Sequence, residues 1–336
     1  MSSNTYKKLV ATQFAPNFAS AIAIVECPIP APATAEILIR NRFAGINAGF
    51  DTLVCRGETP YLNLMPPFDL GVEAVGEVVA VGQDVQDFKI GDAVVTIIRG
   101  GGYREYQAIA AALATKVREV SPAVLTLMPT GVSALVALEQ AGEMKCDEVV
   151  LVTAAAGGTG HIAVQLAKRA GNHVIGTCGS PAKAALLKEL GCDRVINYRT
   201  EDLDQVLQHE YAQGVNLVFD CVGTAVFDIC VRHLAIRGRL VSVGFISEYA
   251  HQPERVMQPR IYHTLFWKAA SVRGFLMPHY SEYLAEGRDR LLQLFYSNQI
   301  NVAIDPTMFD GIESIPAAVN YLLSGQNCGK VVVQFA

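Results

Sequence analysis

Residues 154–160, Ala-Ala-Ala-Gly-Gly-Thr-Gly, are the stretch of this sequence whose composition best suits ligand binding. Small residues let backbone N–H groups approach a phosphate closely, and the N-terminus of a following helix favours negative charge. Aligned to G-x-G-x-x-G, the stretch has alanine at the first position, Ala155. A tight turn in any α/β protein would look similar. We predict a dinucleotide pyrophosphate site here, formed by Gly157, Gly158, Thr159 and Gly160.

A second group of residues indicates which dinucleotide is bound. After the expected strand 173–177, a site for NAD usually carries an Asp or Glu for the ribose 2′-hydroxyl. This chain has Cys178, Gly179, Ser180 and Pro181 there, followed by Lys183. An uncharged pocket with a cation suits a 2′-phosphate, and Tyr198, beside Arg199, could add a hydroxyl. These residues predict NADP(H), although Lys183 could also be a solvated lysine in the first turn of a helix.

The elements that must hold these residues are readable from the hydrophobic pattern. Apolar residues 149–152 predict a buried strand before the glycine-rich loop, and the segment from Ile162 predicts a helix that ends at Gly171. Strands near 149, 174, 195, 217 and 240 alternate with helices, for example 183–190 and 227–234. This alternation predicts a parallel, doubly wound sheet. We also expect a helix over 130–140, a strand over 271–277 and a helix over 284–297.

The first part of the chain has a different texture. Residues 36–40 alternate like a strand, 42–49 are expected to continue as a strand into a loop, and 103–109 to form another strand. Residues 67–92 interleave short Val-rich segments with glycines, which predicts a compact β-barrel. A terminal strand, 330–334, could return to this domain.

Composition narrows the class of protein. A length of 336 residues fits two domains, and 51% hydrophobic with 18% charged residues is typical of a well-buried α/β protein. The net charge of −5 gives no reason to expect nucleic acid as a partner. No apolar run reaching the ~20 residues of a membrane span, no secretory signal and no S-K-L ending were recognised, so we expect no membrane partner and a cytoplasmic protein. The eight cysteines include no C-x₂-C pair, so no zinc knuckle or redox dithiol is expected.

Two stretches resemble the medium-chain dehydrogenase/reductase family, namely GVEAVGEVVAVGQDVQDFKIGD at 71–92 and the AAAGGTG loop. The resemblance implies an α/β protein with a GroES-like β-barrel domain, residues 1–124 and 298–336, and a Rossmann NADP-binding domain, residues 125–297. Zinc-containing members have a Cys in the loop that is Gly45–Asp51 here and a His before the Glu of G-H-E. This chain has no Cys in that loop and has Val72 before Glu73. We therefore expect no metal, which disfavours alcohol oxidation and favours reduction of an activated C=C bond.

Quinone and enone reductases are the zinc-free branch of that family. Three stretches resemble the prostaglandin reductases among them: 152–160, 243–249 and 325–333, with a looser match over 50–65. The resemblance assigns cofactor-binding roles to Thr159, Gly179, Ser180, Lys183, Tyr198, Cys221, Val243, Phe275, Leu276, Met277 and Asn327. It also places Asn47 beside nicotinamide and substrate. Cys221, Val243 and residues 275–277 could instead be simple core.

Tyr249 follows the strand that ends near Gly244, where a doubly wound sheet presents its ligand site. A tyrosine remains protonated at neutral pH and can donate to an enolate oxygen. In the prostaglandin reductases the matching tyrosine has this role and also contacts the cofactor, so Tyr249 is the predicted catalytic donor. Tyr61, Tyr262 and Tyr280 are rival donors, and a tyrosine packed in a surface loop is the alternative.

Together these features predict NADPH-dependent reduction of a bulky apolar α,β-unsaturated ketone, such as a 15-oxo-prostaglandin-like lipid. A quinone oxidoreductase is the alternative enzyme, and an NADPH-binding protein without turnover, as some crystallins are, is the alternative from another class. Residues 271–277 would form an edge strand, and an unpaired edge invites a second copy. We therefore expect a homodimer.

Overall fold

The structure is a computed structural model that describes residues 4–250 and 253–336. The chain divides into two compact units, Met1–Pro129 with Ile304–Ala336, and Thr130–Ala303. The boundaries expected from the sequence, 124/125 and 297/298, lie a few residues before these. The first unit is thus assembled from two separate parts of the chain, and the second from one continuous part.

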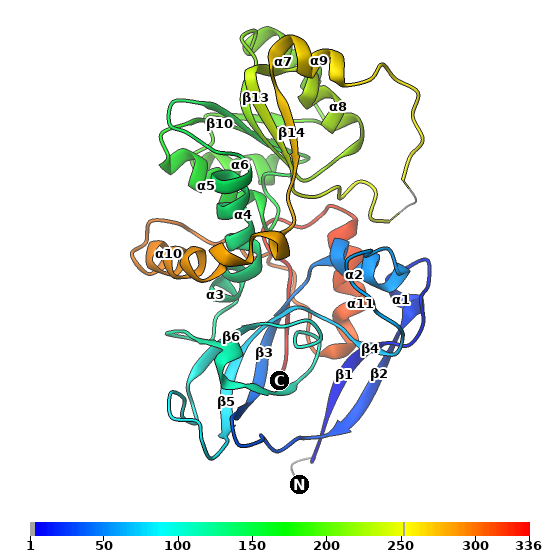
Figure 1. Ribbon diagram of the computed structural model, residues 1–336, viewed down its shortest axis with the longest axis vertical. Coiled ribbons are helices and arrows are strands. Elements are labelled where there is room, and N and C mark those ends of the chain that lie inside the picture. Colours follow the sequence, from blue (N-terminus) through cyan, green and yellow to red (C-terminus); the bar gives the residue numbers. More distant parts are fainter. Residues whose placement is uncertain (1–3, 251–252) are drawn as a thin grey trace. The chain divides into compact units, whose positions relative to one another are not determined.

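The second unit is built on a parallel sheet (Figure 1). Its strands are β9 Val149–Val152, β10 His173–Cys178, β11 Arg194–Asn197, β12 Val215–Asp220, β13 Leu234–Ser242 and β14 Ser271–Gly274. Their spatial order is β11-β10-β9-β12-β13-β14, and every neighbouring pair is parallel. Counted from β9, this is the order 3-2-1-4-5-6 of a doubly wound dinucleotide-binding sheet. The predicted doubly wound sheet is therefore confirmed.

Helices cover both faces of this sheet. Figure 1 shows α4, α5 and α6 on one side and α8 and α9 on the other. Leu151, Ile175 and Leu240 pack beneath α7 and α8 in one buried apolar cluster. The helices are α4 Val132–Val136, α5 Gly160–Arg169, α6 Pro181–Glu189, α7 Leu203–Glu210, α8 Thr224–Arg232, α9 Tyr262–Lys268 and α10 Leu284–Tyr296, with a 3-10 helix at Met277–Tyr283.

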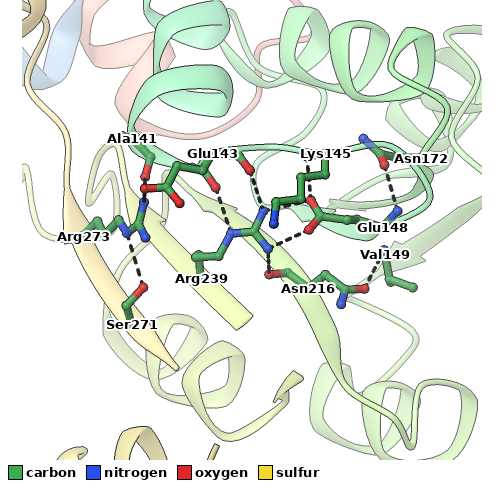
Figure 2. A network of polar contacts seen from close by, with 11 residues as sticks. Ala141, Glu143, Lys145, Glu148, Val149, Asn172, Asn216, Arg239, Ser271 and Arg273 are labelled. Atoms are coloured by element: carbon green, nitrogen blue, oxygen red, sulfur yellow. Dashed lines mark hydrogen bonds and ion pairs between the residues drawn. The ribbon is translucent and has the colours of Figure 1, made fainter. Parts of the chain in front are cut away.

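A largely buried ion pair lies at the amino end of the sheet (Figure 2). The Arg239 guanidinium donates to both carboxylate oxygens of Glu148, at 2.7 and 2.8 Å. It also donates to the carbonyl oxygens of Gly142, Asn216 and Glu143, so all five of its N–H groups are used. Burial alone would raise the pKa of Glu148, but the hydrogen bonds from Arg239 and from the Lys145 backbone outweigh burial and lower it. Polar contacts therefore close the amino end of the sheet.

The first unit consists of antiparallel sheets, as its texture predicted. One has the order β2-β1-β4, and the other has the order β15-β3-β5-β6-β8 with β7 also paired to β3. Their bounds are β1 Thr5–Ala11, β2 Ile22–Pro28, β3 Glu36–Gly45, β4 Phe68–Asp69, β5 Glu73–Val81, β6 Ala93–Ile97, β7 Tyr106–Ala110, β8 Ala114–Lys116 and β15 Val332–Gln334. Strand β15 pairs antiparallel with β3, from Val332 opposite Gly45 to Gln334 opposite Phe43. The expected return of the terminal segment to the first domain is thus observed.

Helices α1 Phe18–Ala21, α2 Ala48–Arg56, α3 Pro122–Thr126 and α11 Ile315–Leu323 complete this unit, with 3-10 helices at Ala111–Leu113 and Ile312–Ser314. Its main apolar cluster joins residues from both parts of the chain, among them Leu9, Val54, Ile315 and Phe335. Helix α2 occupies the segment for which we expected a loop after 42–49. The expected strand 271–277 was also too long, because β14 ends at Gly274 and a 3-10 helix begins at Met277.

One helical stretch, Pro122–Ala141, corrects the expectation that no apolar run reaches the length of a membrane span. It comprises α3, α4 and two π-helical segments, Leu127–Gly131 and Ala137–Ala141. With 20 residues and a mean hydropathy of 1.4 it is long and apolar enough to cross a membrane, which we had not recognised in the sequence. Within the protein 72% of its most apolar window is buried, as in a core helix. It contains the helix predicted over 130–140.

Candidate functional site

The glycine-rich loop lies between β9 and α5, as predicted. Gly160 begins α5 so close to the loop that a Cβ there would lie 2.5 Å from the Ala154 oxygen and 2.7 Å from the Ala155 Cα. Only glycine fits this strand–helix contact. The neighbouring strand β10 makes room for the alanine at the first fingerprint position. The Ala155 methyl faces Gly176, and a Cβ on Gly176 would lie only 3.1 Å from that methyl carbon. The departure from the strict fingerprint is therefore compensated within the sheet.

The loop also offers the donors that a pyrophosphate needs. In the part of the chain that the structure describes, the backbone N–H groups of Gly158 and Thr159 donate no hydrogen bond within the protein. Both residues are partly exposed, and they stand immediately before the N-terminus of the ten-residue helix α5. Unpaired N–H groups at a helix N-terminus suit an anion, so the loop fits a dinucleotide pyrophosphate.

The residues predicted to bind the 2′-phosphate lie together after β10. The Ser180 hydroxyl caps α6 by accepting from the Lys183 backbone N–H at 3.3 Å. A Cβ on Gly179 would lie 2.7 Å from Cζ of Tyr198, so the tyrosine ring is seated against this glycine. Tyr198 itself is held by a 3.1 Å hydrogen bond from its N–H to the Cys178 oxygen, and its side chain is 54% exposed. The partly exposed Gly179 and Ser180 thus have the Tyr198 ring and the Lys183 backbone N–H against them, and this loop contains no acid.

Asp220, at the end of β12, anchors the carboxyl edge of the sheet and was not singled out from the sequence. Its carboxylate accepts from the Thr153 hydroxyl at 2.7 Å and from the N–H groups of Val222 and Gly223. Burial raises the pKa of Asp220, partly offset by these hydrogen bonds. The Asp220 carbonyl accepts from the Val243 N–H at 2.7 Å. An acid at the end of a buried strand was the available signal, and it was passed over for the adjacent Cys221.

Cys221, Val243 and Tyr249 are brought together beside this anchor. The Tyr249 hydroxyl accepts from the Phe245 N–H at 3.3 Å and lies 3.1 Å from where a Cβ on Gly244 would be. The Cys221 Cα is 3.8 Å from that same point. Burial raises the pKa of Tyr249 to about 12, so its hydroxyl keeps its proton at neutral pH. Burial also raises the pKa of the Cys221 thiol, which therefore stays protonated.

A shallow pocket opens at the carboxyl ends of β13 and β14. It is lined by Ser242, Gly274, Phe275, Leu276, His279 and Tyr280. The Phe275 N–H donates to the Ser242 oxygen at 3.0 Å, and the rings of Phe275 and Tyr280 lie 5.1 Å apart. Two of the three residues predicted to meet the nicotinamide carboxamide thus line this pocket, while Met277 begins the adjacent 3-10 helix.

The remaining predicted residues, Asn47, Tyr61 and Asn327, belong to the first unit. The Asn47 amide lies between two buried charges: its Nδ2 donates to Glu73 Oε1 at 2.7 Å, and its Oδ1 accepts from Lys330 Nζ at 2.9 Å. Lys330 also contacts Glu73 Oε1 at 2.7 Å. Because an ammonium can only donate and a carboxylate can only accept, the amide has one possible orientation. Neither Glu73 nor Lys330 carries a local sequence signal for this pairing.

Tyr61 and Asn327 stand apart from that network. Tyr61 is 41% exposed, and partial burial raises its pKa, against a lowering by Arg99. The Asn327 side chain donates to the Gly329 oxygen at 2.9 Å and is 9% exposed. The described residues contain no group of three or more His, Cys, Asp or Glu side chains that could hold a metal ion. Glu73, which follows Val72, is paired with the Lys330 ammonium.

Comparisons with known proteins agree with this geometry. A family model for the alcohol dehydrogenase GroES-like domain matches residues 33–119, and one for zinc-binding dehydrogenases matches 158–305. The chain is 42% identical to prostaglandin reductase-3 of Mus musculus, over 98% of this chain and 89% of that protein. It is 38% identical to a probable quinone oxidoreductase of Leishmania amazonensis, over 99% of both. Escherichia coli quinone oxidoreductase, solved as a complex with NADPH, superposes with a TM-score of 0.82 at 29% identity over 98% of this chain and 99% of that chain. The predicted combination of a GroES-like and a Rossmann domain is confirmed.

Proposed function

Because the chain belongs to the medium-chain dehydrogenase/reductase family, we propose that it is an NADPH-dependent reductase of the C=C bond of α,β-unsaturated ketones. The observation that carries the proposal is the 42% identity to a prostaglandin reductase along 98% of the chain. The cofactor assignment is supported by the acid-free loop at Gly179, Ser180 and Lys183 and by the related quinone oxidoreductase that binds NADPH. The substrate class is a bulky apolar enone, such as a 15-oxo-prostaglandin-like lipid.

The residues of the chain have separate tasks in this reaction. The glycine loop, Gly157–Gly160, would hold the pyrophosphate, and Ser180, Lys183 and Tyr198 the 2′-phosphate. Cys221, Val243 and residues 275–277 would border the nicotinamide. When bound, NADPH supplies a hydride to the β-carbon of the enone. Tyr249 would donate a hydrogen bond to the carbonyl oxygen, where negative charge collects, and thereby lower the barrier.

A quinone oxidoreductase is the second candidate, favoured by the Leishmania amazonensis relative that covers 99% of both chains. The same cofactor loop would serve it, and negative charge would then collect on a quinone oxygen. An NADPH-binding protein without turnover is the candidate from another class. The three differ in which acceptor, if any, oxidises NADPH.

The test follows NADPH absorbance with an aliphatic enone, a quinone and no acceptor, alongside a direct measurement of NADPH binding. Faster oxidation with the enone than with the quinone is expected. Preference for the quinone would replace the first candidate by the second, and binding without oxidation by either acceptor would favour the third.

Metal independence is a separate expectation, motivated by Val72 and by the pairing of Glu73 with Lys330. Activity should survive exhaustive treatment with EDTA or phenanthroline, and elemental analysis should find no stoichiometric zinc. Activity that is lost on chelation and restored by zinc would contradict it.

A further inference from the structure

His161, the second residue of α5, joins the glycine-rich loop to the end of the second unit. Its ring is fully buried. Nδ1 lies 2.9 Å from the Gly157 oxygen, and Nε2 lies 3.1 Å from the Ala303 backbone nitrogen. The His161 backbone N–H donates to the same Gly157 oxygen at 3.1 Å. One residue therefore supplies two hydrogen bonds to one carbonyl of the loop.

The partners determine the protonation of the ring. A carbonyl oxygen only accepts, so Nδ1 must carry a hydrogen; a backbone N–H only donates, so Nε2 must be bare. His161 is thus a neutral imidazole whose two nitrogens have different tasks. Nδ1 holds the loop, and Nε2 holds the chain at Ala303.

The direction of the Gly157 carbonyl also fixes the direction of the Gly158 N–H, because both belong to one planar peptide unit. In a planar trans peptide the N–H points opposite to the C=O of the same unit. When the Gly157 oxygen is held toward His161, the Gly158 N–H must point away from α5, to the partly exposed side where it has no partner in the described protein. That direction is the one needed by a donor to a phosphate at a helix N-terminus.

We propose that His161 is a positioning residue for cofactor binding: its Nδ1–H fixes the Gly157–Gly158 peptide so that the Gly158 N–H faces the cofactor pyrophosphate. The inference rests on NADPH binding alone and holds whether the acceptor is an enone or a quinone.

Two substitutions separate the tasks of the ring nitrogens. The amide nitrogen of asparagine is bonded to Cγ, as Nδ1 of histidine is. His161→Asn can therefore still donate to the Gly157 oxygen, but it loses the Ala303 contact. The amide of glutamine reaches as far as Nε2, so His161→Gln can accept from Ala303 but loses the loop contact. NADPH affinity is measured by calorimetry for each, with thermal melting as a check on folding. For the NADPH Kd we expect less than about twofold change in His161→Asn and an increase of roughly three- to tenfold in His161→Gln, the worth of one hydrogen bond.

A second ligand distinguishes positioning from general damage to the fold. Adenosine 2′-monophosphate carries the 2′-phosphate but no pyrophosphate, so its affinity should be the same in His161→Gln and in the unsubstituted protein. Equal NADPH affinity of the two variants would overturn the proposal. So would parallel weakening of NADPH and adenosine 2′-monophosphate, because that result would mean His161 supports the domain as a whole.

Discussion

The Tyr249 hydroxyl accepts from the Phe245 N–H at 3.3 Å, and an accepting hydroxyl is a stronger donor of its own hydrogen. Tyr249→Phe removes only that hydroxyl. If Tyr249 donates to the enolate oxygen, kcat with an enone should fall by roughly tenfold to a thousandfold, while NADPH binding changes little. Steady-state kinetics and an NADPH titration measure both quantities.

Tyr211→Phe is the matched control for this experiment. Burial also raises the pKa of Tyr211, but its hydroxyl contacts His173 at the amino end of β10. The control should keep its kcat. An unchanged kcat in Tyr249→Phe would remove Tyr249 from the mechanism and direct attention to Tyr61.

Lys183 tests the cofactor assignment at the same scale. Its backbone N–H donates to the Ser180 cap, and Lys183→Ala keeps this hydrogen bond at the start of α6. Loss of a charge-assisted contact with the 2′-phosphate should weaken NADPH binding by about tenfold to a hundredfold and leave NADH binding unaltered. Titration of both dinucleotides decides the point, since equal weakening would mean that the lysine serves the fold.

The junction of β3 and α2 carries a buried acid whose protonation should be visible in stability. Asp51 accepts from the Tyr103 hydroxyl at 2.5 Å and from the Asn47 N–H at 3.2 Å. Burial raises its pKa from 3.8 to about 7, against the lowering effect of the hydrogen bond from Tyr103. The folded protein therefore holds a proton that the unfolded chain releases between about pH 4 and pH 7. The free energy of unfolding should fall as pH rises through that window, by up to about 4 kcal/mol, and level off above pH 7.

Asp51→Asn removes this titration. On going from pH 5 to pH 7.5, the free energy of unfolding of the unsubstituted protein should fall by about 2–4 kcal/mol more than that of the variant. Urea unfolding at the two pH values measures this difference. Asp92→Asn is the control, because the hydrogen bond from Lys116 lowers the pKa of Asp92 and its contribution changes only below pH 4. Parallel pH profiles for Asp51→Asn and the unsubstituted protein would show that Asp51 is ionised throughout.

Elements with a strong local pattern were predictable, and contacts between distant residues were not. The apolar run of β9 and the small residues after it identified the dinucleotide-binding unit, because strand burial and close backbone approach both restrict residue type. Helix α2 was taken for a loop, since Gly49, Thr52 and Val54 have low helix propensity and its stability comes from packing in the first unit. The contacts of Lys330 with Asn47 and Glu73 join residues hundreds of positions apart, so no local sequence pattern predicts them. His161 was passed over because a histidine in an apolar helix has no distinctive spacing.

At the scale of the whole molecule, the edge of the parallel sheet predicts self-association. Strand β14 pairs with β13 on one side, and within the described residues no strand pairs with its other side. An exposed strand edge favours pairing with a second copy. Light scattering at micromolar concentration should give twice the chain mass of 36.2 kDa. A monomer mass would contradict the dimer.

Strand β15 has a consequence for how the protein is made. Val331, Val333 and Phe335 are buried in the first unit, and Lys330 contacts Asn47 and Glu73 there. A ribosome releases these residues only after the whole of Thr130–Ala303, about ten seconds or more after Pro129 at usual rates of translation. The second unit can therefore fold during synthesis, while in the first unit the Phe43–Gly45 end of β3, beyond the part paired with β7, still waits for β15. Nascent chains should depend on chaperones for the first unit and not for the second, an inversion of the usual N-terminal-first order.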